Sequence, residues 1–267
     1  MPTNRSFDKR DISRSFSGAS TSYDDFASLQ RTIGEKLMAQ TILSNHPFGT
    51  ILDAGSGTGF LTSKLRETYT DNNIIALDIA DAMLTKAKKN QISDVDFVCA
   101  DAEKLPLADE SIASIFSNLA FQWSTNLPAV FSESYRVMKT GGVLVFSSFG
   151  PTTLCELNDA WSSADGSVHV NSFTSAEKIT AYLGAAGFID SHVHYQTITF
   201  HYPSAIELMR DLKGMGAHNI NSQRKKGLTG KDAFKRMLEK YEQYRVEEGL
   251  PATFQAVYGF ARKKAAF

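Results

Sequence analysis

Cysteine is scarce in this sequence, since only Cys99 and Cys155 occur among its 267 residues, far apart. Their separation fits neither a disulfide framework nor a metal site, so we expect small core side chains or free thiols. Long apolar runs are also missing, because no stretch approaches the roughly 20 apolar residues that cross a bilayer. The polar residues 1–14 lack the apolar centre of a secretory signal. We therefore expect a cytoplasmic protein without a membrane partner.

Charge of one sign is not in excess, because 28 Lys and Arg oppose 29 Asp and Glu, for a formal net charge of -1. This overall balance excludes no class of partner. Hydrophobic residues make up 42% of the chain, and we find no internal repeat. A chain of this length and composition can bury one substantial core, so we expect one domain with an inserted or appended subdomain.

The stretch from Ile51 to Gly59 reads I-L-D-A-G-S-G-T-G, the pattern of a buried strand that breaks into a tight turn before a helix. Gly55, Gly57 and Gly59 lack a Cβ, so the backbone can adopt positive φ and turn amides toward a bound group. The spacing G-x-G-x-G differs from the dinucleotide fingerprint G-x-G-x-x-G. Taken alone, the motif leaves two interpretations open, a cofactor-binding turn and an ordinary strand-to-helix turn.

Two further predicted strands end in an acidic residue. The apolar run Ile74–Leu77 ends in Asp78, about twenty residues past the glycine turn, where doubly wound folds hold ribose hydroxyls. Asp78 could instead cap the next helix. The segment Val95–Ala100 ends in Asp101, which Ala102 follows. Because ligands bind outside the carboxyl ends of parallel strands, the three strand ends predict one ligand site.

Four more predicted strands complete the sheet. Segments 111–117 and 143–149 are apolar and read as buried strands, whereas segments 191–202 and 253–262 alternate polar and apolar residues and should pair antiparallel. Between the last two, residues 207–245 carry a local charge excess of +5. This excess predicts a surface for an acidic partner or a solvated helix face, and charge alone leaves both open.

The strand-end motifs resemble those of class I S-adenosylmethionine-dependent methyltransferases. The resemblance implies an α/β, Rossmann-like fold with a seven-stranded, mostly parallel sheet, a reversed last strand, helices on both faces and a helical insertion before the last strand. It also implies that Asp53 and the glycine turn hold the methionine end and ribose of the cofactor, Asp78 the ribose, and Asp101 with the Ala102 amide the adenine edge.

The string S-Y-D-D-F-A-S-L-Q-R at 22–31 resembles the N-terminal cover of these enzymes. We therefore expect Tyr23 and Gln30 to touch the cofactor, with plain helix packing as the alternative. Residues 1–26 otherwise have the polar composition of a solvated terminus. The implied cofactor residues are Asp53, Gly55, Ser56, Gly57, Gly59, Asp78, Ile79, Met83, Asp101, Ala102, Asn118, Leu119, Tyr23 and Gln30.

Longer strings resemble one family within that superfamily, the malonyl-acyl-carrier-protein O-methyltransferases of biotin synthesis. They are F-G-P-T-T-L-C-E-L at 149–157, L-M-R-D-L-K-G-M-G-A-H-N at 208–219 and P-A-T-F-Q-A-V-Y-G-F-A-R-K at 251–263, and residues 8–24 are similar too. The resemblance spans nearly the whole chain. It implies four parts, namely an N-terminal cover and helix (1–45), a cofactor-binding core (46–203), a basic helical insertion that forms a lid for the substrate and carrier (204–250) and the last strand (251–267).

The family resemblance implies methyl transfer from S-adenosylmethionine to the free carboxylate of a malonyl thioester on acyl carrier protein, with S-adenosylhomocysteine as the product. The ester masks a charge, so that fatty-acid enzymes can elongate the chain toward the pimeloyl group of biotin. A carboxylate is already ionised at pH 7, so we expect no residue that acts as general acid or base, and no metal. The expected substrate-orienting residues are Arg210, Lys213, His218, Asn219, Gln122 and Trp123, although Trp123 could simply fill the core.

Arg224, Lys225 and Lys226 are the expected docking residues for the acidic carrier protein. The nearest alternative is a carboxyl methyltransferase that acts on a small diacid or a CoA thioester. The glycine spacing disfavours an NAD-dependent oxidoreductase. A nucleic-acid methyltransferase should interleave exposed aromatic residues with its basic ones, and the insertion does not, so we expect no nucleic-acid partner. A non-catalytic module that binds the cofactor would have the same motifs.

Overall fold

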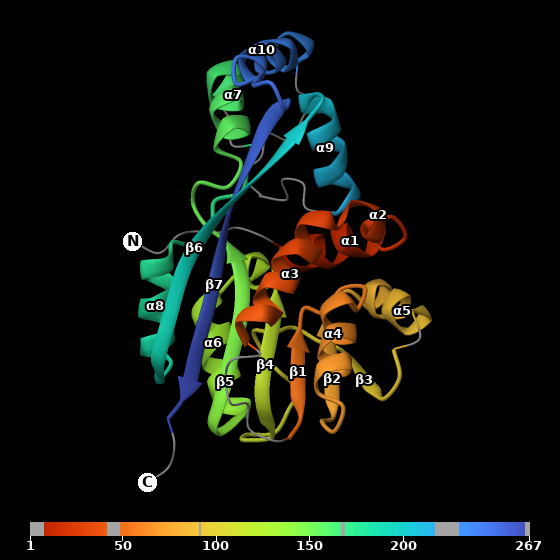
Figure 1. Cartoon of the computed structure of the whole chain (residues 1–267), viewed down its shortest axis with the longest axis vertical. Helices are drawn as coiled ribbons and strands as arrows, with labels where there is room; N and C mark the ends of the chain where they lie inside the picture. Colours follow the sequence, from red (N-terminus) through yellow and green to blue (C-terminus); the bar gives the residue numbers. More distant parts are fainter. Residues whose placement is uncertain (1–7, 42–48, 91, 167–168, 217–229, 265–267) are drawn as a thin grey trace.

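The computed structural model describes residues 8–41, 49–90, 92–166, 169–216 and 230–264. Seven strands form one sheet in the order β3-β2-β1-β4-β5-β7-β6 (Figure 1). The strands are β1 (Ile51–Ala54), β2 (Ile74–Asp78), β3 (Val95–Cys99), β4 (Ile112–Asn118), β5 (Met138–Phe149), β6 (Phe188–Tyr202) and β7 (Leu250–Lys263).

Strand directions confirm the predicted topology. β1 to β5 pair in parallel, whereas β7 runs antiparallel to both of its neighbours, β5 and β6. β7 is therefore the reversed last strand. The strand order turns back at β1, from which β2 and β3 lie to one side and β4 and β5 to the other. Parallel sheets bind ligands outside the carboxyl ends of the strands at such a point.

Helices cover both faces of the sheet, as the family resemblance implied. α3 and α4 pack on one face, where Ile33 and Leu65 are buried, and α6 and α8 pack on the other with Phe131 and Ile179. The helices are α1 (Lys9–Ala19), α2 (Tyr23–Phe26), α3 (Ser28–Thr41), α4 (Phe60–Thr68), α5 (Asp81–Lys89), the 3-10 turn η1 (Phe121–Trp123), α6 (Leu127–Val137), α7 (Cys155–Asp165), α8 (Ala176–Ala185), α9 (Ala205–Gly214) and α10 (Lys231–Glu242).

The insertion before the last strand is helical, as predicted, and it sits at the end of a two-stranded ribbon. β5 pairs with β7 only as far as Phe149, but β6 and β7 continue together to Tyr202 and Leu250. α7, α9 and α10 gather at the far end of this ribbon (Figure 1). Tyr241 of α10 is fully buried and donates a hydrogen bond to the Pro251 carbonyl at 2.7 Å. The insertion therefore shares a continuous core with the sheet.

Two expectations about the chain as a whole have clear outcomes. Cys99 and Cys155 are exposed free thiols, so neither fills the core. Within the described ranges, no helix is both long enough and apolar enough to span a bilayer.

Candidate active site

A cavity lies at the carboxyl ends of β1, β2 and β4, beneath α1 and α2. It holds about 790 Å³ of space not filled by atoms, part of it open to solvent, and small-molecule sites are of this order. Ten of the fourteen residues implied to bind the cofactor line it. They are Tyr23, Gly55, Gly57, Asp78, Ile79, Met83, Asp101, Ala102, Asn118 and Leu119.

The glycine turn brings bare backbone to the cavity. Gly55, Gly57 and Gly59 have φ of +80°, +55° and +92°, which other residues rarely adopt. A Cβ on Gly55 would lie 2.1 Å from the Cβ of Ala120, so a side chain there would displace the residues that follow β4. Gly57 lines the cavity and has open space around its Cβ position. Glycine is thus required at Gly55 for packing and at Gly57 for its backbone conformation.

Asp78 holds the glycine turn against the end of β2. Its Oδ2 accepts a hydrogen bond from the Gly57 amide at 2.9 Å, and its Oδ1 accepts one from the Ala80 amide at 2.8 Å. The Gly55 amide also donates to the Leu77 carbonyl at 2.7 Å. Burial raises the pKa of Asp78, although the amides of Ala80 and Gly57 stabilise its charged form. Asp78 therefore orients the turn and borders the cavity at once.

Asp53 is completely buried one residue before Ala54, which lines the cavity. Its Oδ2 accepts a hydrogen bond from the Thr62 hydroxyl at 2.6 Å, and its Oδ1 has no hydrogen-bond partner among the described residues. Burial raises the pKa of Asp53 to about 7, although the Thr62 hydroxyl favours the ionised form. A buried acceptor without a partner is costly, so Asp53 is suited to receive a donor from a ligand.

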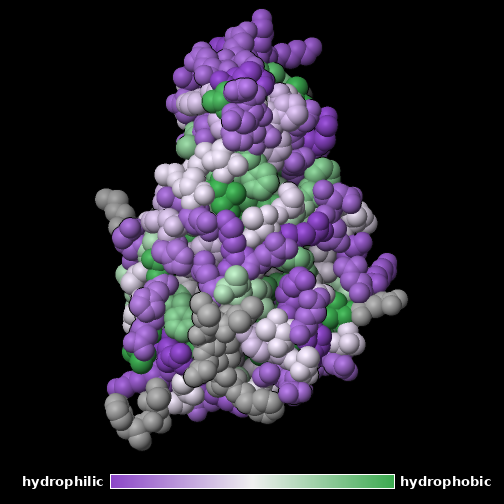
Figure 2. Space-filling view, in the orientation of Figure 1, coloured by the Kyte–Doolittle hydropathy of each residue, from purple (hydrophilic) through white to green (hydrophobic). Residues whose placement is uncertain are grey.

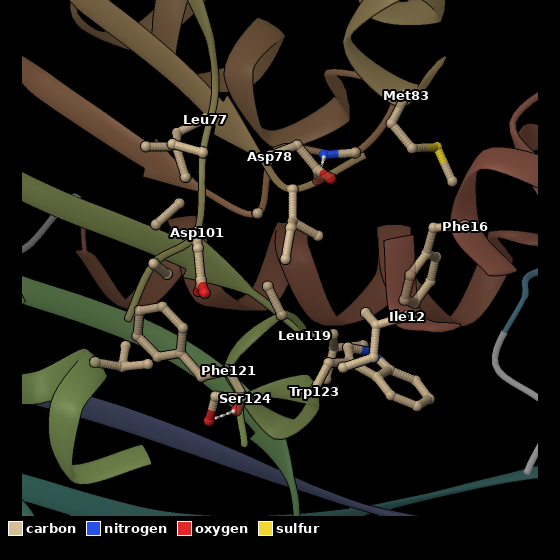
Figure 3. Close-up of a pocket in the computed structure, with 18 of the residues that line it drawn as sticks. Ile12, Phe16, Leu77, Asp78, Met83, Asp101, Leu119, Phe121, Trp123 and Ser124 are labelled. Atoms are coloured by element: carbon tan, nitrogen blue, oxygen red, sulfur yellow. Dashed lines mark hydrogen bonds between the residues drawn. The ribbon is translucent and has the colours of Figure 1, made fainter. Parts of the chain in front are cut away.

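The N-terminal helix covers the cavity. Ile12 and Phe16 of α1 lie beside Trp123 of η1, while Asp101 and Phe121 lie on the other side in the same view (Figure 3). The Phe16 and Trp123 rings meet edge to face, with centroids 5.3 Å apart. Trp123 therefore belongs to the site and does not merely fill the core.

α9 supports this cover from the insertion. The Ser15 hydroxyl donates to the Gly216 carbonyl at 3.0 Å, and the Ser22 hydroxyl contacts the Gly214 carbonyl at 3.3 Å. Gly214 packs so closely on Phe26 that a Cβ would lie 2.3 Å from the ring. The cover is therefore built from two segments about 200 residues apart in sequence.

Four implied cofactor residues do not line the cavity. Asp53 and Ser56 are buried behind it. Gly59, at the start of α4, packs on Ala87 of α5. Gln30 places its Nε2 2.9 Å from the Met215 sulfur, and its carbonyl accepts a hydrogen bond from Asn118. Gln30 thus makes the helix-packing contacts that were the alternative to cofactor contact.

Most of the expected substrate-orienting residues that the structure describes do not line the cavity. Trp123 lines the cavity, but Gln122 is buried and donates to the Leu119 carbonyl at 2.6 Å. Arg210 and Lys213 are exposed on α9, because this helix turns Leu208, and neither cation, toward the core. His218, Asn219, Arg224, Lys225 and Lys226 lie outside the described residues.

Sequence reasoning missed several lining residues, among them Lys9, Ile12 and Phe16 of α1. The charged composition of residues 1–26 suggested a solvated terminus, yet α1 has one apolar face, with Ile12 buried. The i, i+4 spacing of Ile12 and Phe16 was the available signal. Glu103 and Ser124 follow the ends of β3 and β4, which the sheet topology alone predicts to be near the site.

Comparison with known proteins agrees with this geometry. Residues 52–146 match a family model described as a methyltransferase domain. The chain is 40% identical to the malonyl-[acyl-carrier protein] O-methyltransferase of Nitrosospira multiformis, over 97% of this chain and 90% of that protein. The chain belongs to the malonyl-[acyl-carrier protein] O-methyltransferase family. The enzyme of the same name from Gallionella capsiferriformans is also 40% identical, over 97% of this chain and 92% of its own.

The fold is also found in a solved structure of phosphoethanolamine N-methyltransferase 2 from Haemonchus contortus in complex with S-adenosyl-L-methionine. The TM-score is 0.56 at 16% identity, over 94% of this chain and 57% of that one. At this low identity the likeness shows that the two proteins share a fold, which agrees with membership of the malonyl-[acyl-carrier protein] O-methyltransferase family. The Rossmann-like class I methyltransferase architecture predicted from the sequence is thereby confirmed.

S-adenosylmethionine, the methyl donor of this family, fits the residues around the cavity. The unpartnered Asp53 Oδ1 suits the amino group of the donor, and the half-buried Gly57, with no atom within 4 Å of its Cβ position, leaves room for a polar ligand. Asp78 and Asp101 line the cavity, and carboxylate oxygens accept hydrogen bonds from hydroxyl and amino groups. Ile79, Met83 and Phe121 supply apolar walls.

Proposed function

We propose that this protein transfers a methyl group from S-adenosylmethionine to the free carboxylate of a malonyl thioester on acyl carrier protein. Identity of 40% over nearly the whole chain to an enzyme named for this reaction is the observation that carries the proposal. When bound, the donor supplies a methyl group on a positively charged sulfur, and its transfer to a carboxylate oxygen leaves S-adenosylhomocysteine and a methyl ester.

The residues of this chain then have to bind and orient the donor and the carboxylate, and to exclude water from them. A carboxylate is ionised at pH 7, so the reaction requires no proton transfer. Ile12, Phe16, Leu119 and Trp123 form an apolar rim on the covered side of the cavity. Removal of water from the carboxylate and its alignment with the methyl group supply the acceleration.

Lys9 is the one lysine or arginine among the described residues that line the cavity, and it is already paired. Its Nζ lies 2.5 Å from Asp101 Oδ2 and 2.6 Å from Glu103 Oε2. A tight ion pair with the substrate carboxylate would weaken the nucleophile. We infer that Lys9 serves the cover and does not hold the malonyl carboxylate.

One assay tests the proposed reaction. Radiolabelled S-adenosylmethionine is offered together with malonyl carrier protein, malonyl-CoA, free malonate or RNA, and base-labile label in the acceptor is measured. We expect methyl ester on the carrier-bound malonyl group, and none on acetyl carrier protein, which has no free carboxylate. Faster labelling of malonyl-CoA or of a free diacid would instead support the alternative carboxyl methyltransferase.

The exposed basic residues of the insertion are the proposed docking surface for the acidic carrier. Arg210 and Lys213 project from α9, which packs on α2 at the edge of the cavity, and Lys231 and Lys235 are exposed on α10. Figure 2 shows mostly hydrophilic side chains over this end of the molecule. Steering between exposed charges weakens with salt. The KM for malonyl carrier protein should therefore rise with ionic strength, and a flat salt dependence would exclude electrostatic docking.

A further inference from the structure

A second cavity lies directly behind Trp123, which lines both spaces. It holds about 460 Å³ not filled by atoms, part of it open to solvent. Its boundaries are the carboxyl end of β5, the amino-terminal part of β7, α7 and the side of α9 that bears Leu212. Phe149 and Phe254 form one wall, with their ring centroids 5.8 Å apart. Leu154 and Leu157 form another. A ligand whose reacting end lay near Trp123 would find in this cavity a mostly apolar channel for the rest of its length.

The backbone around this second cavity is held in an uncommon conformation. Leu154 has φ of +56°, although it is neither glycine nor asparagine, and its amide donates to the Thr253 carbonyl at 2.6 Å. Non-glycine residues in this region carry strain that the surroundings must offset, and such residues cluster at ligand sites. Leu119, which lines the first cavity, has φ of +51°. Each cavity is thus bordered by one strained leucine.

Three polar side chains line the second cavity, and two of them are already engaged. The Thr153 hydroxyl donates to the Gln255 carbonyl at 3.4 Å and accepts from its amide at 3.1 Å. His169 contacts Asp165 through Nε2 at 3.0 Å, and its ring stacks on Trp161 with centroids 3.8 Å apart.

Asn171 is different, because it is only 8% exposed and its Oδ1 has no hydrogen-bond partner among the described residues. A buried amide oxygen without a donor is unfavourable in the free protein. The remainder of the cavity wall is largely aromatic and aliphatic. A suitable ligand therefore presents methylene groups to the walls and one N–H group to Asn171.

We infer that this second cavity binds the thioester end of the pantetheine arm, and that Asn171 accepts a hydrogen bond from the amide N–H two methylene groups beyond the sulfur. This inference rests on the proposed function, because the malonyl carboxylate must lie on the Trp123 side for the thioester to extend into the second cavity. Carrier protein and CoA share this chemical group. Asn171 consequently recognises the arm, and the choice between the two carriers is made outside this cavity.

Two small malonyl thioesters test the inference without any carrier. One is the N-acetylcysteamine thioester, which has the amide, and the other is an S-alkyl thioester of equal length, which lacks it. For the unaltered enzyme we expect kcat/KM to favour the amide-bearing thioester by roughly 5- to 20-fold, the range for a site that is left with an unpaired buried acceptor. In Asn171→Leu this ratio should fall to about 1.

Thr153→Val is the matched control, since it removes a polar lining group whose hydrogen bonds are made within the protein. The ratio between the two thioesters should stay as in the unaltered enzyme, even if thermal stability falls. S-adenosylhomocysteine binding by calorimetry shows whether each variant is folded. If Asn171→Leu is not, Asn171→Ala replaces it, because this change also removes the acceptor and should also bring the ratio to about 1. Asn171→Asp, by contrast, keeps an acceptor. Asn171→Asp should retain a preference for the amide-bearing thioester.

Failure of the inference and failure of the proposed function are distinguishable. An equal ratio in the unaltered enzyme and in Asn171→Leu would overturn the role of Asn171 while malonyl methylation stands. If neither thioester nor malonyl carrier protein is methylated, the proposed function itself is wrong. Faster turnover of the S-alkyl thioester by the unaltered enzyme would also overturn the inference.

Discussion

Lys9 Nζ lies 2.5 Å from Asp101 Oδ2, although the two residues are 92 positions apart in sequence. This contact joins the first turn of α1 to the end of β3, where a second carboxylate, Glu103, lies 2.6 Å from the same ammonium. Hydrogen bonds to both carboxylates raise the pKa of Lys9, although burial opposes the shift. The cover is thereby tied to the same strand end that borders the cofactor cavity.

Loss of this tie should weaken cofactor binding. In Lys9→Met we expect the Kd for S-adenosylhomocysteine to rise by about 3- to 10-fold, because partly exposed ion pairs contribute modestly. Isothermal calorimetry measures this directly. Arg14→Met is the matched control, since Arg14 is an exposed cation of the same helix that pairs with Asp11, also in α1. Equal affinities in the two variants would contradict a role for Lys9 in the cover.

The pKa of about 7 at Asp53 predicts a pH-dependent stability. An unfolded Asp titrates near 3.9, so the stability gained from the raised folded pKa is fully present below about pH 4. It is lost as the pH rises through about 7. In the absence of cofactor, the unaltered protein should therefore lose more Tm between pH 5.5 and 8 than Asp53→Asn does. Parallel Tm curves for the two proteins would show that Asp53 is already ionised across this range.

The same titration should appear in cofactor binding. An ammonium group on the ligand favours the carboxylate form of Asp53, so affinity for S-adenosylhomocysteine should increase as the pH rises through about 7. Asp53→Asn should bind more weakly and without this increase. Calorimetry at several pH values measures both effects, and an affinity of Asp53→Asn that follows the same pH curve as the unaltered enzyme would assign the titration to another group.

Gly55→Ala should damage both folding and the site. The new Cβ would lie 2.1 Å from Ala120, and φ of +80° is strained for alanine. We expect a loss of about 2–4 kcal/mol in the free energy of unfolding, from overpacking and backbone strain together. Gly184→Ala is the control, because Gly184 is exposed in α8 with nothing within 4 Å of its Cβ position. That change should raise the free energy of unfolding by about 0.5–1 kcal/mol. Urea unfolding measures the stability of both variants, and calorimetry measures their binding of S-adenosylhomocysteine.

Docking of the carrier should depend on α9. Lys213→Glu and Arg210→Glu should raise the KM for malonyl carrier protein several-fold and leave the KM for the N-acetylcysteamine thioester unchanged. Lys64→Glu, which reverses a partly exposed cation of α4 that pairs with Glu67, is the control. An equal rise with both substrates would instead place the α9 cations in recognition of the malonyl group itself.

Much of the fold was predictable from local sequence. The glycine turn, Asp78 and Asp101 each follow an apolar run, and parallel strands bring such positions to one edge. That reasoning places the floor of the cavity correctly, as seen at Asp78 and Gly57, whose contact is a 2.9 Å hydrogen bond. Alternation of polar and apolar residues was likewise enough to predict the antiparallel pair β6 and β7.

The cover and the substrate side could not be predicted in the same way. Lys9 and Asn171 are polar residues whose neighbours come from distant segments, so nothing in their local sequence distinguishes them from solvated positions. Charge drew attention to Arg210 and Lys213, but the side of α9 that faces the core is set by Ala205, Leu208 and Leu212. Helical periodicity at these apolar positions would have placed both cations in solvent.

The position of β7 between β5 and β6 has a consequence for synthesis of the protein. Among the described strands β6 pairs with β7 alone, and β7 leaves the ribosome after the other six strands of the sheet. During translation β6 therefore has no strand to pair with, and the outer edge of β5 stays open until residues 250–263 emerge. Pairing of distant segments is slow. The nascent chain thus carries two unprotected strand edges until the final step of assembly, which makes this interval its most aggregation-prone one.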